Sequence, residues 1–151
     1  SIELCMVGPD KDGSLGLCKN LAMELGVLER INFTGYLSKD EWISLSDDYH
    51  IFINTTNYDN HPISLLEAMA LGLPVVTTNV QGIPYFLNES VAILTRKNSV
   101  ESMVTSVKRI IKNPSIGKSL AKNARLEIET KYSKSVVLDQ WEIIISQAIC
   151  G

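Results

Sequence analysis

Short apolar runs alternate along the chain with longer segments in which apolar residues recur at helical spacing. The short runs, which are the expected strands, cover residues 2–7, 31–35, 50–55, 74–78 and 91–94. All but the second are apolar on both alternating faces, as buried parallel strands are. Strands alternating with helices in this way predict an α/β fold with a doubly wound, mostly parallel sheet.

The longer segments predict helices with recognisable ends. They cover residues 14–25, 39–48, 62–71, 103–111 and 115–130, and a last amphipathic helix passes through Val137, Trp141, Ile144 and Ala148. Ser14 and Ser38 are expected to cap the first two helices. Pro62 suits a first helical position, and Gly72 suits the residue that ends the same helix.

Length and composition fit one globular domain spanning residues 1–151. Apolar residues make up 45% of the 151 positions, which is enough to fill a single core. The formal net charge of −3 gives no electrostatic reason to expect nucleic acid or an anionic membrane as a partner.

The cysteines and the hydropathy indicate a cytoplasmic protein without a metal. Cys5, Cys18 and Cys150 lie in apolar patterns, without CxxC pairing and without a histidine nearby in sequence. Neither a disulfide framework nor a zinc site is indicated by this spacing. The sequence shows no signal peptide and no apolar run of the length that spans a bilayer.

The chemistry is expected in loops that follow strands, because ligands of open α/β sheets bind beyond the carboxyl ends of the strands. The helix that begins at Pro62 is almost wholly apolar but contains Glu67. A buried carboxylate without partners costs several kcal/mol or takes up a proton, so Glu67 implies hydrogen-bond donors. Two readings stay open: donors within the protein, or the two hydroxyls of a ribose.

A second acid, Asp59, precedes Glu67 by eight residues, in the loop ahead of the helix. The free amides of Ile63, Ser64 and Leu65 at the helix N-terminus favour an anion.

These residues form a longer pattern. An acid, seven other residues and then Glu in "LLEAMALGLPVV", followed by "TTNVQGIPYF", resembles the family 4 retaining glycosyltransferases of GT-B fold. The similarity extends upstream through "ELCMVGPDKDG" and "INFTGYLSKDE", and downstream through residues 103–111, so it covers essentially the whole chain. It implies the Rossmann-like, C-terminal donor-binding domain of a larger two-domain enzyme.

The resemblance also implies roles for single residues. Glu67 looks like the second acid of the motif, which binds the ribose of a sugar nucleotide, and Asp59 takes the place of the first acid, near the transferred sugar and the reacting centre. These two are the expected catalytic residues. The amides of residues 63–65 would approach the diphosphate or the sugar. Further binding positions implied in this way are Gly8, Pro9, Gly35 and Tyr36, around the base, and His61, which would contact the sugar or pack the loop.

The chain departs from the family pattern at several positions. Asp59 is one methylene shorter than the usual Glu, Asn60 stands where Gly is frequent, and Gln81-Gly82 replaces a Gly-Gly pair. These departures affect the identity of the sugar more than the class of reaction.

Cations for the diphosphate are also missing near the helix that begins at Pro62. Relatives supply an Arg and a Lys from a strand-and-helix unit that precedes "ELCMVG", and this unit is not present in the sequence. We therefore expect the fragment alone to be inactive. With the strand order 3-2-1-4-5-6, the absent strand would leave "ELCMV" and "IFINT" with unpaired edges.

The implied donor is a sugar nucleotide such as a UDP- or GDP-hexose, with no other cofactor and no metal. The acceptor, a sugar or a glycolipid in glycan biosynthesis, would bind through an N-terminal domain. The whole enzyme would be cytoplasmic. A peripheral association with the cytoplasmic face of a membrane is compatible with this location. The basic run from Lys118 to Lys134, interleaved with Glu127 and Glu129, is expected to be a solvated helix face.

Two rivals belong to other functional classes. A non-catalytic, nucleotide-binding regulatory module of Rossmann-like fold would use the same cleft. A phosphoacceptor signalling domain would need an Asp at the end of the third strand, where this chain has Asn54 and Thr55. The stretch "GPDKDGS" has the glycine spacing of a phosphate-binding loop but lacks its lysine, so a tight connection is the better reading.

Overall fold

The computed structural model describes residues 2–150, and the chain divides into two compact units, Ser1–Asp47 and Asp48–Gly151. Each unit contains one sheet, with strand order β1-β2 in the first and β3-β4-β5 in the second. Every ladder is parallel. The predicted α/β class with parallel strands is therefore confirmed, whereas the expectation of a single domain stays a prediction.

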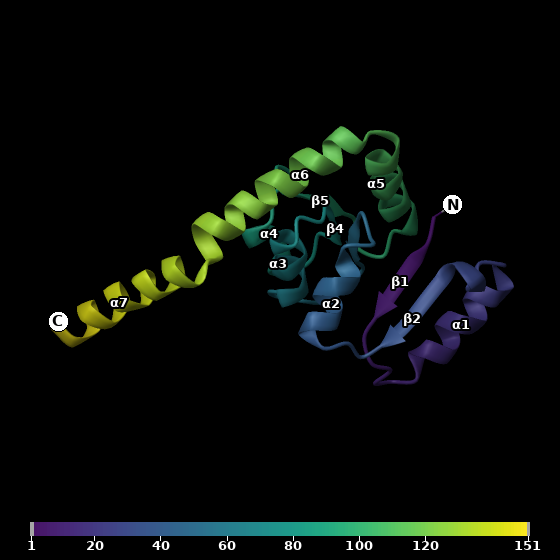
Figure 1. Ribbon diagram of the computed structural model, residues 1–151, viewed down its shortest axis with the longest axis horizontal. Coiled ribbons are helices and arrows are strands. Elements are labelled where there is room, and N and C mark those ends of the chain that lie inside the picture. The colour runs from purple at the N-terminus through teal and green to yellow at the C-terminus, as the bar shows by residue number, and fades with distance from the viewer. Residues whose placement is uncertain (1, 151) are drawn as a thin grey trace. The chain divides into compact units, whose positions relative to one another are not determined.

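The first unit is a two-stranded sheet with helices. Its elements are β1 (Leu4–Val7), α1 (Ser14–Glu24), the 3-10 helix η1 (Leu28–Arg30), β2 (Ile31–Gly35) and α2 (Lys39–Ser46). Figure 1 shows α1 beside the two strands. The register pairs Met6 with Phe33 and Val7 with Gly35, so Thr34 is an extra residue in β2. This irregularity comes just before the loop that follows β2.

The burial expected for β1 is wrong. Leu4, Met6 and Val7 are exposed rather than buried, and only Cys5 in this strand is half-buried. A sheet of two strands carries too little neighbouring structure within its unit to cover both faces of an apolar strand. The sheet order places β1 and β3 at ends of their sheets, so the unpaired edges expected for these strands are present.

The caps of the first two helices differ from each other. Ser14 is the first residue of α1, and Gly13 takes the cap position expected for it. The amide of Gly13 donates to the Asp10 carboxylate at 2.9 Å, and the amide of Ser14 donates to the Asp12 carboxylate at 3.0 Å. Hydrogen bonds from the hydroxyl and then the amide of Ser14 hold the pKa of Asp12 below its usual value. Ser38, in contrast, caps α2 as predicted.

The second unit begins with the three-stranded sheet and ends in helices. Its elements are β3 (Phe52–Asn54), α3 (Ile63–Ala70), β4 (Val75–Thr78), α4 (Ile83–Phe86), β5 (Ala92–Thr95), α5 (Val100–Lys112), α6 (Pro114–Glu127), the π-helix η2 (Ile128–Tyr132) and α7 (Lys134–Cys150). The predicted strands and long helices are all present, with shifted ends. The one-turn helix α4 was not predicted, because four residues are too few to show a period.

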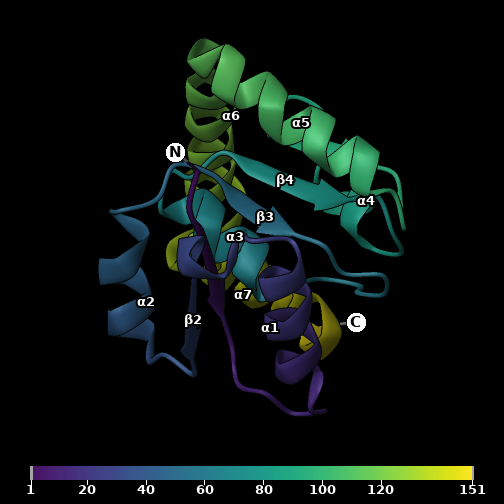
Figure 2. The same cartoon turned by 90° about the vertical axis from the view of Figure 1, so that its right-hand side faces the viewer.

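Strand β4 is the centre of the second unit. It pairs with β3 on one edge and β5 on the other, and all four of its residues are buried. Figure 2 shows α3 on one side of β3 and β4 and α5 on the other. The fully buried side chains of Leu65, Met69 and Ile83 complete this core. β4 thus has the burial on both faces that its apolar sequence predicted.

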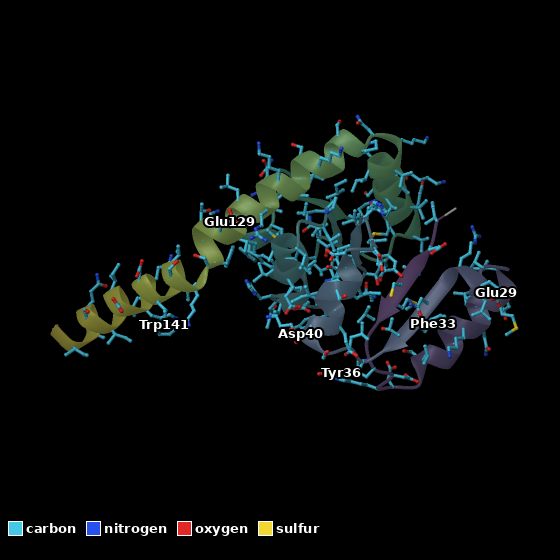
Figure 3. The ribbon with its side chains drawn as sticks, viewed as in Figure 1. Glu29, Phe33, Tyr36, Asp40, Glu129 and Trp141 are labelled. Atoms are coloured by element: carbon cyan, nitrogen blue, oxygen red, sulfur yellow. The ribbon has the colours of Figure 1, made fainter. Side chains whose placement is uncertain are left out.

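The C-terminal helices are only partly covered. The predicted stripe of α5 contributes Ile110 to the core, and α6 contributes Leu120 and Ala124. Of the apolar stripe predicted for α7, Trp141 (57% exposed, Figure 3), Ile144 and Ala148 stay exposed, whereas Val137 is half-buried. Within residues 2–150, no helix has both the length and the hydropathy that crossing a bilayer requires.

The core of the second unit contains one unsatisfied hydroxyl, which generates a first prediction. Thr77 Oγ1 is buried and has no hydrogen-bond partner among the described residues. Replacing Thr77 by Val removes this hydroxyl at nearly constant volume, so we expect the free energy of unfolding to rise by about 1 kcal/mol. Urea denaturation of the two proteins measures the difference.

Thr95 provides the control for this prediction. It is also buried, but its hydroxyl donates to the carbonyl of Thr77 at 3.2 Å. Thr95→Val should therefore lower the stability by about 1 kcal/mol. An equal decrease in the free energy of unfolding of both variants would show that the Thr77 hydroxyl does have a hydrogen-bond partner.

A second prediction concerns the capping box of α2. The amide and the hydroxyl of Ser38 donate to Glu41 Oε2 at 2.8 and 2.7 Å, and the amide of Glu41 donates back to the Ser38 hydroxyl. The Ser38 hydroxyl, followed by its amide, holds the pKa of Glu41 below its usual value of 4.5. Because the folded pKa is depressed, this contribution to stability is present above pH 4.5 and is lost as the pH falls through the folded pKa.

Ser38→Ala should raise the pKa of Glu41 towards its usual value and shorten α2 from its N-terminus. An NMR titration of the Glu41 carboxyl measures the shift. Ser44→Ala, on the same helix but outside the capping box, should leave this pKa unchanged. An unchanged pKa in Ser38→Ala would show that the capping box does not form.

Candidate functional site

The loop after β3 is held by its own side chains. Asn54 Oδ1 accepts from the amide of Thr56 at 2.9 Å, and the Thr56 hydroxyl donates to the carbonyl of Tyr58 at 3.1 Å. The hydroxyl of Thr78, the last residue of β4, donates to the carbonyl of Thr56. The loop is therefore fixed both to itself and to the neighbouring strand.

The end of this loop forms a tight turn around Asp59. The carboxylate Oδ1 of Asp59 accepts from the amide of His61 at 3.0 Å, and Pro62 follows as the cap residue of α3. Such Asx turns are typical of Asp and Asn, whose short side chains reach the backbone two residues on. Asp59 therefore shapes the loop that leads into α3, and an Asn at this position would keep the same acceptor.

The N-terminus of α3 has no side-chain cap. Pro62, expected at the first helical position, lies one residue earlier as the cap residue, with extended ψ of 114°, and supplies no side-chain hydrogen bond to the helix. At the other end, Gly72 has φ of 75° and its amide bonds the carbonyl of Met69 at 3.1 Å, which is the predicted glycine stop. Of the three amides expected to be free, that of Leu65 donates to the carbonyl of Pro62 at 3.1 Å. The first turn of α3 thus presents the amides of Ile63 and Ser64 and the positive end of the helix dipole.

The loop after β4 packs directly on the loop after β3. The amide of Gly82 donates to the carbonyl of Asp59 at 3.4 Å. A Cβ atom on Gly82 would lie 1.9 Å from the carbonyl oxygen of Asn60, so only glycine fits here. The preceding residue, Gln81, has φ of 45°, a conformation that costs a non-glycine residue energy.

His61 belongs to the same loop pair. Its ring packs against that of Phe86 in α4, with centroids 4.4 Å apart and planes inclined by 35°. This contact supports the loop-packing reading of His61, while its exposed side leaves contact with a ligand open. Phe86 was not predicted as part of the site, because α4 is too short to show a periodic signal.

The environment of Glu67 differs from the expected one. Leu65, Ala68 and Met69 are buried, but Glu67 is half-buried and Ile63, one turn earlier on the same side, is 68% exposed. The helix is therefore buried on one face and not on most sides. Because Glu67 keeps contact with water and has a partner within the protein, its desolvation cost is smaller than the sequence suggested.

The remaining predicted site residues lie in the first unit. There the amide of Gly8 donates to the carbonyl of Gly35 at 2.9 Å, and both glycines have positive φ, of 141° and 70°. Pro9 follows in an exposed loop, and Tyr36 is 76% exposed (Figure 3). The structure thus brings Gly8 and Gly35 together, and in the second unit it gathers Asp59, His61 and the start of α3.

The charge around the second-unit site comes from few residues. Arg96 and Lys97 follow β5, are exposed, and lie at the edge of the sheet at which the loops after β3 and β4 also leave it. Among residues 2–150, no group of three or more His, Cys, Asp or Glu side chains could hold a metal ion. The arrangement is suited to an anion at the α3 amides and to hydroxyl groups at the two carboxylates.

Comparison with known proteins gives a family and a fold. The family model described as "Glycosyl transferases group 1" matches residues 1–127. The capsular polysaccharide biosynthesis glycosyltransferase CapM of Staphylococcus aureus is 26% identical over 101 residues, covering 66% of this chain and 27% of the relative. The alpha-D-kanosaminyltransferase of Streptomyces kanamyceticus is 25% identical over 116 residues, covering 76% and 30%.

Solved structures match nearly the whole chain. A glycosyltransferase from Rickettsia africae superposes with a TM-score of 0.89 at 18% identity, over 99% of this chain and 40% of its own. Anabaena HepE in complex with UDP gives a TM-score of 0.85 at 18% identity, over 97% and 41%. These structures establish the fold. The chain spans 27–30% of the two relatives and 40–41% of the two structures.

The contact between Gly82 and Asn60 generates a third prediction. Gly82→Ala must push the Asp59–His61 loop away, so we expect a loss of about 1–3 kcal/mol in stability and displaced amide signals for residues 59–61. Gly16→Ala is the control, because Gly16 lies inside α1 with open space around its Cβ position. That variant should gain about 0.5–1 kcal/mol.

Denaturant unfolding and amide NMR spectra measure both variants. Unperturbed signals of residues 59–61 in Gly82→Ala would show that the two loops do not pack as described.

Proposed function

This chain belongs to the group 1 glycosyl transferase family, and we propose that it forms the sugar-nucleotide-binding part of a larger glycosyltransferase. The observation that carries the proposal is the uncapped first turn of α3, beside the fixed Asp59–Pro62 loop and with Glu67 one turn further along. This arrangement offers amides to a diphosphate and carboxylates to hydroxyl groups within one short stretch of chain.

The proposed donor is a UDP- or GDP-hexose. Structures of Anabaena HepE in complex with UDP and with UDP-glucose support the choice of a nucleoside diphosphate sugar. In this chain, the amides of Ile63 and Ser64 would meet the diphosphate, since the amide of Leu65 donates to the carbonyl of Pro62. Glu67 would accept hydrogen bonds from the ribose. Gly8, Pro9, Gly35 and Tyr36 of the first unit stay predicted binding positions.

Asp59 would act near the transferred sugar. Its carboxylate oxygen Oδ1 is engaged by the amide of His61, which leaves the second oxygen for a sugar hydroxyl. His61, fixed by Phe86, would border the same sugar. The length of Asp relative to Glu then places the sugar closer to the Asp59–His61 turn, which is why we connect this residue with sugar preference.

The complete reaction belongs to the whole enzyme. We propose transfer of a hexosyl group with retention of configuration to an acceptor sugar or glycolipid, bound by a separate N-terminal domain, without metal or other cofactor. Arg96 and Lys97 follow β5 at the same edge of the sheet as the loops after β3 and β4. Further positive charge from the rest of the enzyme would complete the diphosphate site, which is why the fragment alone is expected to be inactive.

The location is proposed on chemical grounds. The cysteine pattern favours a reducing compartment, so we place the enzyme in the cytoplasm, with a glycolipid acceptor bringing it to the cytoplasmic face of a membrane.

A fourth prediction tests the donor site. Glu67→Gln should weaken donor binding about 10–100-fold, because a hydrogen bond to a charged group contributes about 1.5–3 kcal/mol. Calorimetry on the full-length protein with UDP-, GDP- and ADP-sugars measures the affinity and identifies the base. Glu89→Gln is the control, because Glu89 precedes β5 and therefore lies at the opposite edge of the sheet.

Asp59→Asn separates nucleotide binding from sugar transfer in the same protein. It keeps the acceptor for the His61 amide, so the loop is retained while the charge near the sugar is removed. We expect binding of UDP without sugar to be preserved and turnover to be lost. If the wild type binds none of the nucleotides, or if Glu67→Gln binds the preferred donor as well as the wild type does, the proposal is wrong. Binding without any sugar transfer would favour a regulatory module.

A further inference from the structure

Arg125, near the end of α6, connects this helix with the last residue of α3. Its Nη1 donates to the carbonyl of Ala70, and its Nε donates to Glu129 Oε1 at 2.6 Å. Arg125 and Ala70 are separated by 55 residues in sequence. Glu129 lies in the π-helical turn η2 that follows α6 (Figure 3).

The bond completes the C-terminal end of α3. The last four carbonyls of a helix have no partner within it. Here the carbonyls of Glu67, Ala68 and Met69 accept from the backbone amides of Leu71, Leu73 and Gly72. The carbonyl of Ala70 is the next in this series, and it accepts from the Arg125 guanidinium, whose charge also suits the negative end of the helix dipole.

The packing of α6 supports the same connection. Both α6 and η2 contact α3, and Gly117 of α6 lies against the loop that follows α3. A Cβ on Gly117 would lie 3.2 Å from Pro74 Cγ and 2.8 Å from Ile110 Cγ2, so α6 approaches the chain closely there. Helix α6 therefore contacts the end of α3 at Ala70 and the following loop at Pro74.

The ion pair contributes to placement more than to stability. The side chains of Arg125 and Glu129 are 54% and 55% exposed, and pairs at this exposure add little to the free energy of unfolding. Glu129 instead restricts the guanidinium to the orientation in which it reaches Ala70.

We propose that Arg125 is a positioning residue for the donor site. It holds the C-terminal end of α3, a helix about 12 Å long, and thereby sets the direction in which the opposite end presents its amides and Glu67. This inference rests on the proposed function of α3. A tilt that moves the first turn by about 1 Å is enough to weaken a polar contact severely.

The chain offers a matched control in the same two turns. Lys131 Nζ lies 2.6 Å from Glu127 Oε1, also at i,i+4 spacing, with side chains 61% and 14% exposed. Within the described residues, Lys131 donates to Glu127 and makes no hydrogen bond to α3. Lys131→Ala therefore removes a comparable ion pair without touching the carbonyl of Ala70.

The experiment compares Arg125→Ala, Arg125→Lys and Lys131→Ala in the full-length protein. Amide hydrogen exchange reports on α3 without any ligand, and calorimetry with UDP-glucose reports on the donor site. We expect Arg125→Ala to speed exchange of residues 63–70 about tenfold and to weaken UDP-glucose binding about three- to tenfold. Exchange in β4 should stay unchanged.

Arg125→Lys should keep most of the wild-type protection of α3 and most of the affinity for UDP-glucose. A lysine ammonium can donate to the Ala70 carbonyl, even though it cannot reproduce the paired donors of the guanidinium. Lys131→Ala should match the wild type in both measurements. If Arg125→Ala exchanges in α3 as the wild type does, or if Lys131→Ala changes α3 equally, the positioning role is wrong. Wild-type affinity for UDP-glucose in Arg125→Ala also overturns it. If the wild type binds neither UDP-glucose nor a GDP-hexose, the proposed function itself is wrong.

Discussion

The placement of β4 between β3 and β5 is the constraint on which the candidate site depends. All four residues of β4 are buried, and both of its edges are used by parallel ladders, so this strand cannot shift without breaking the core of its unit. Because the ladders are parallel, the loops after β3 and β4 leave the same edge of the sheet. Gly82 then brings the two loops into backbone contact.

Helix α3 is the main element of the candidate site, and its two sides differ in burial. Leu65, Ala68 and Met69 fix the helix in the core, while its first turn and Glu67 keep contact with solvent. A wholly buried helix would have made a charged Glu67 expensive, and a wholly exposed one would have left its orientation loose. The bond from Arg125 adds a fixed point at the far end.

The two units differ in how far their apolar residues are covered. In the second unit the sheet has strands or helices on all sides of β4, whereas β1 in the first unit leaves Leu4, Met6 and Val7 exposed. The apolar side of α1, including Leu17 and Leu21, is exposed as well. Exposed apolar surface of this extent is typical of regions that contact other structure. The proposal of a larger enzyme accounts for it.

The sequence by itself determined the elements and the family. Apolar runs of strand length, helical periods, Ser38 as a cap and Gly72 as a stop depend on neighbours in the chain, so local patterns predict them. Tertiary structure alone decided which faces are covered. The exposure of β1, the half-burial of Glu67, the fit of Gly82 against Asn60 and the reach of Arg125 to Ala70 each depend on residues distant in sequence. No local pattern contains those contacts, because they form only when the elements pack.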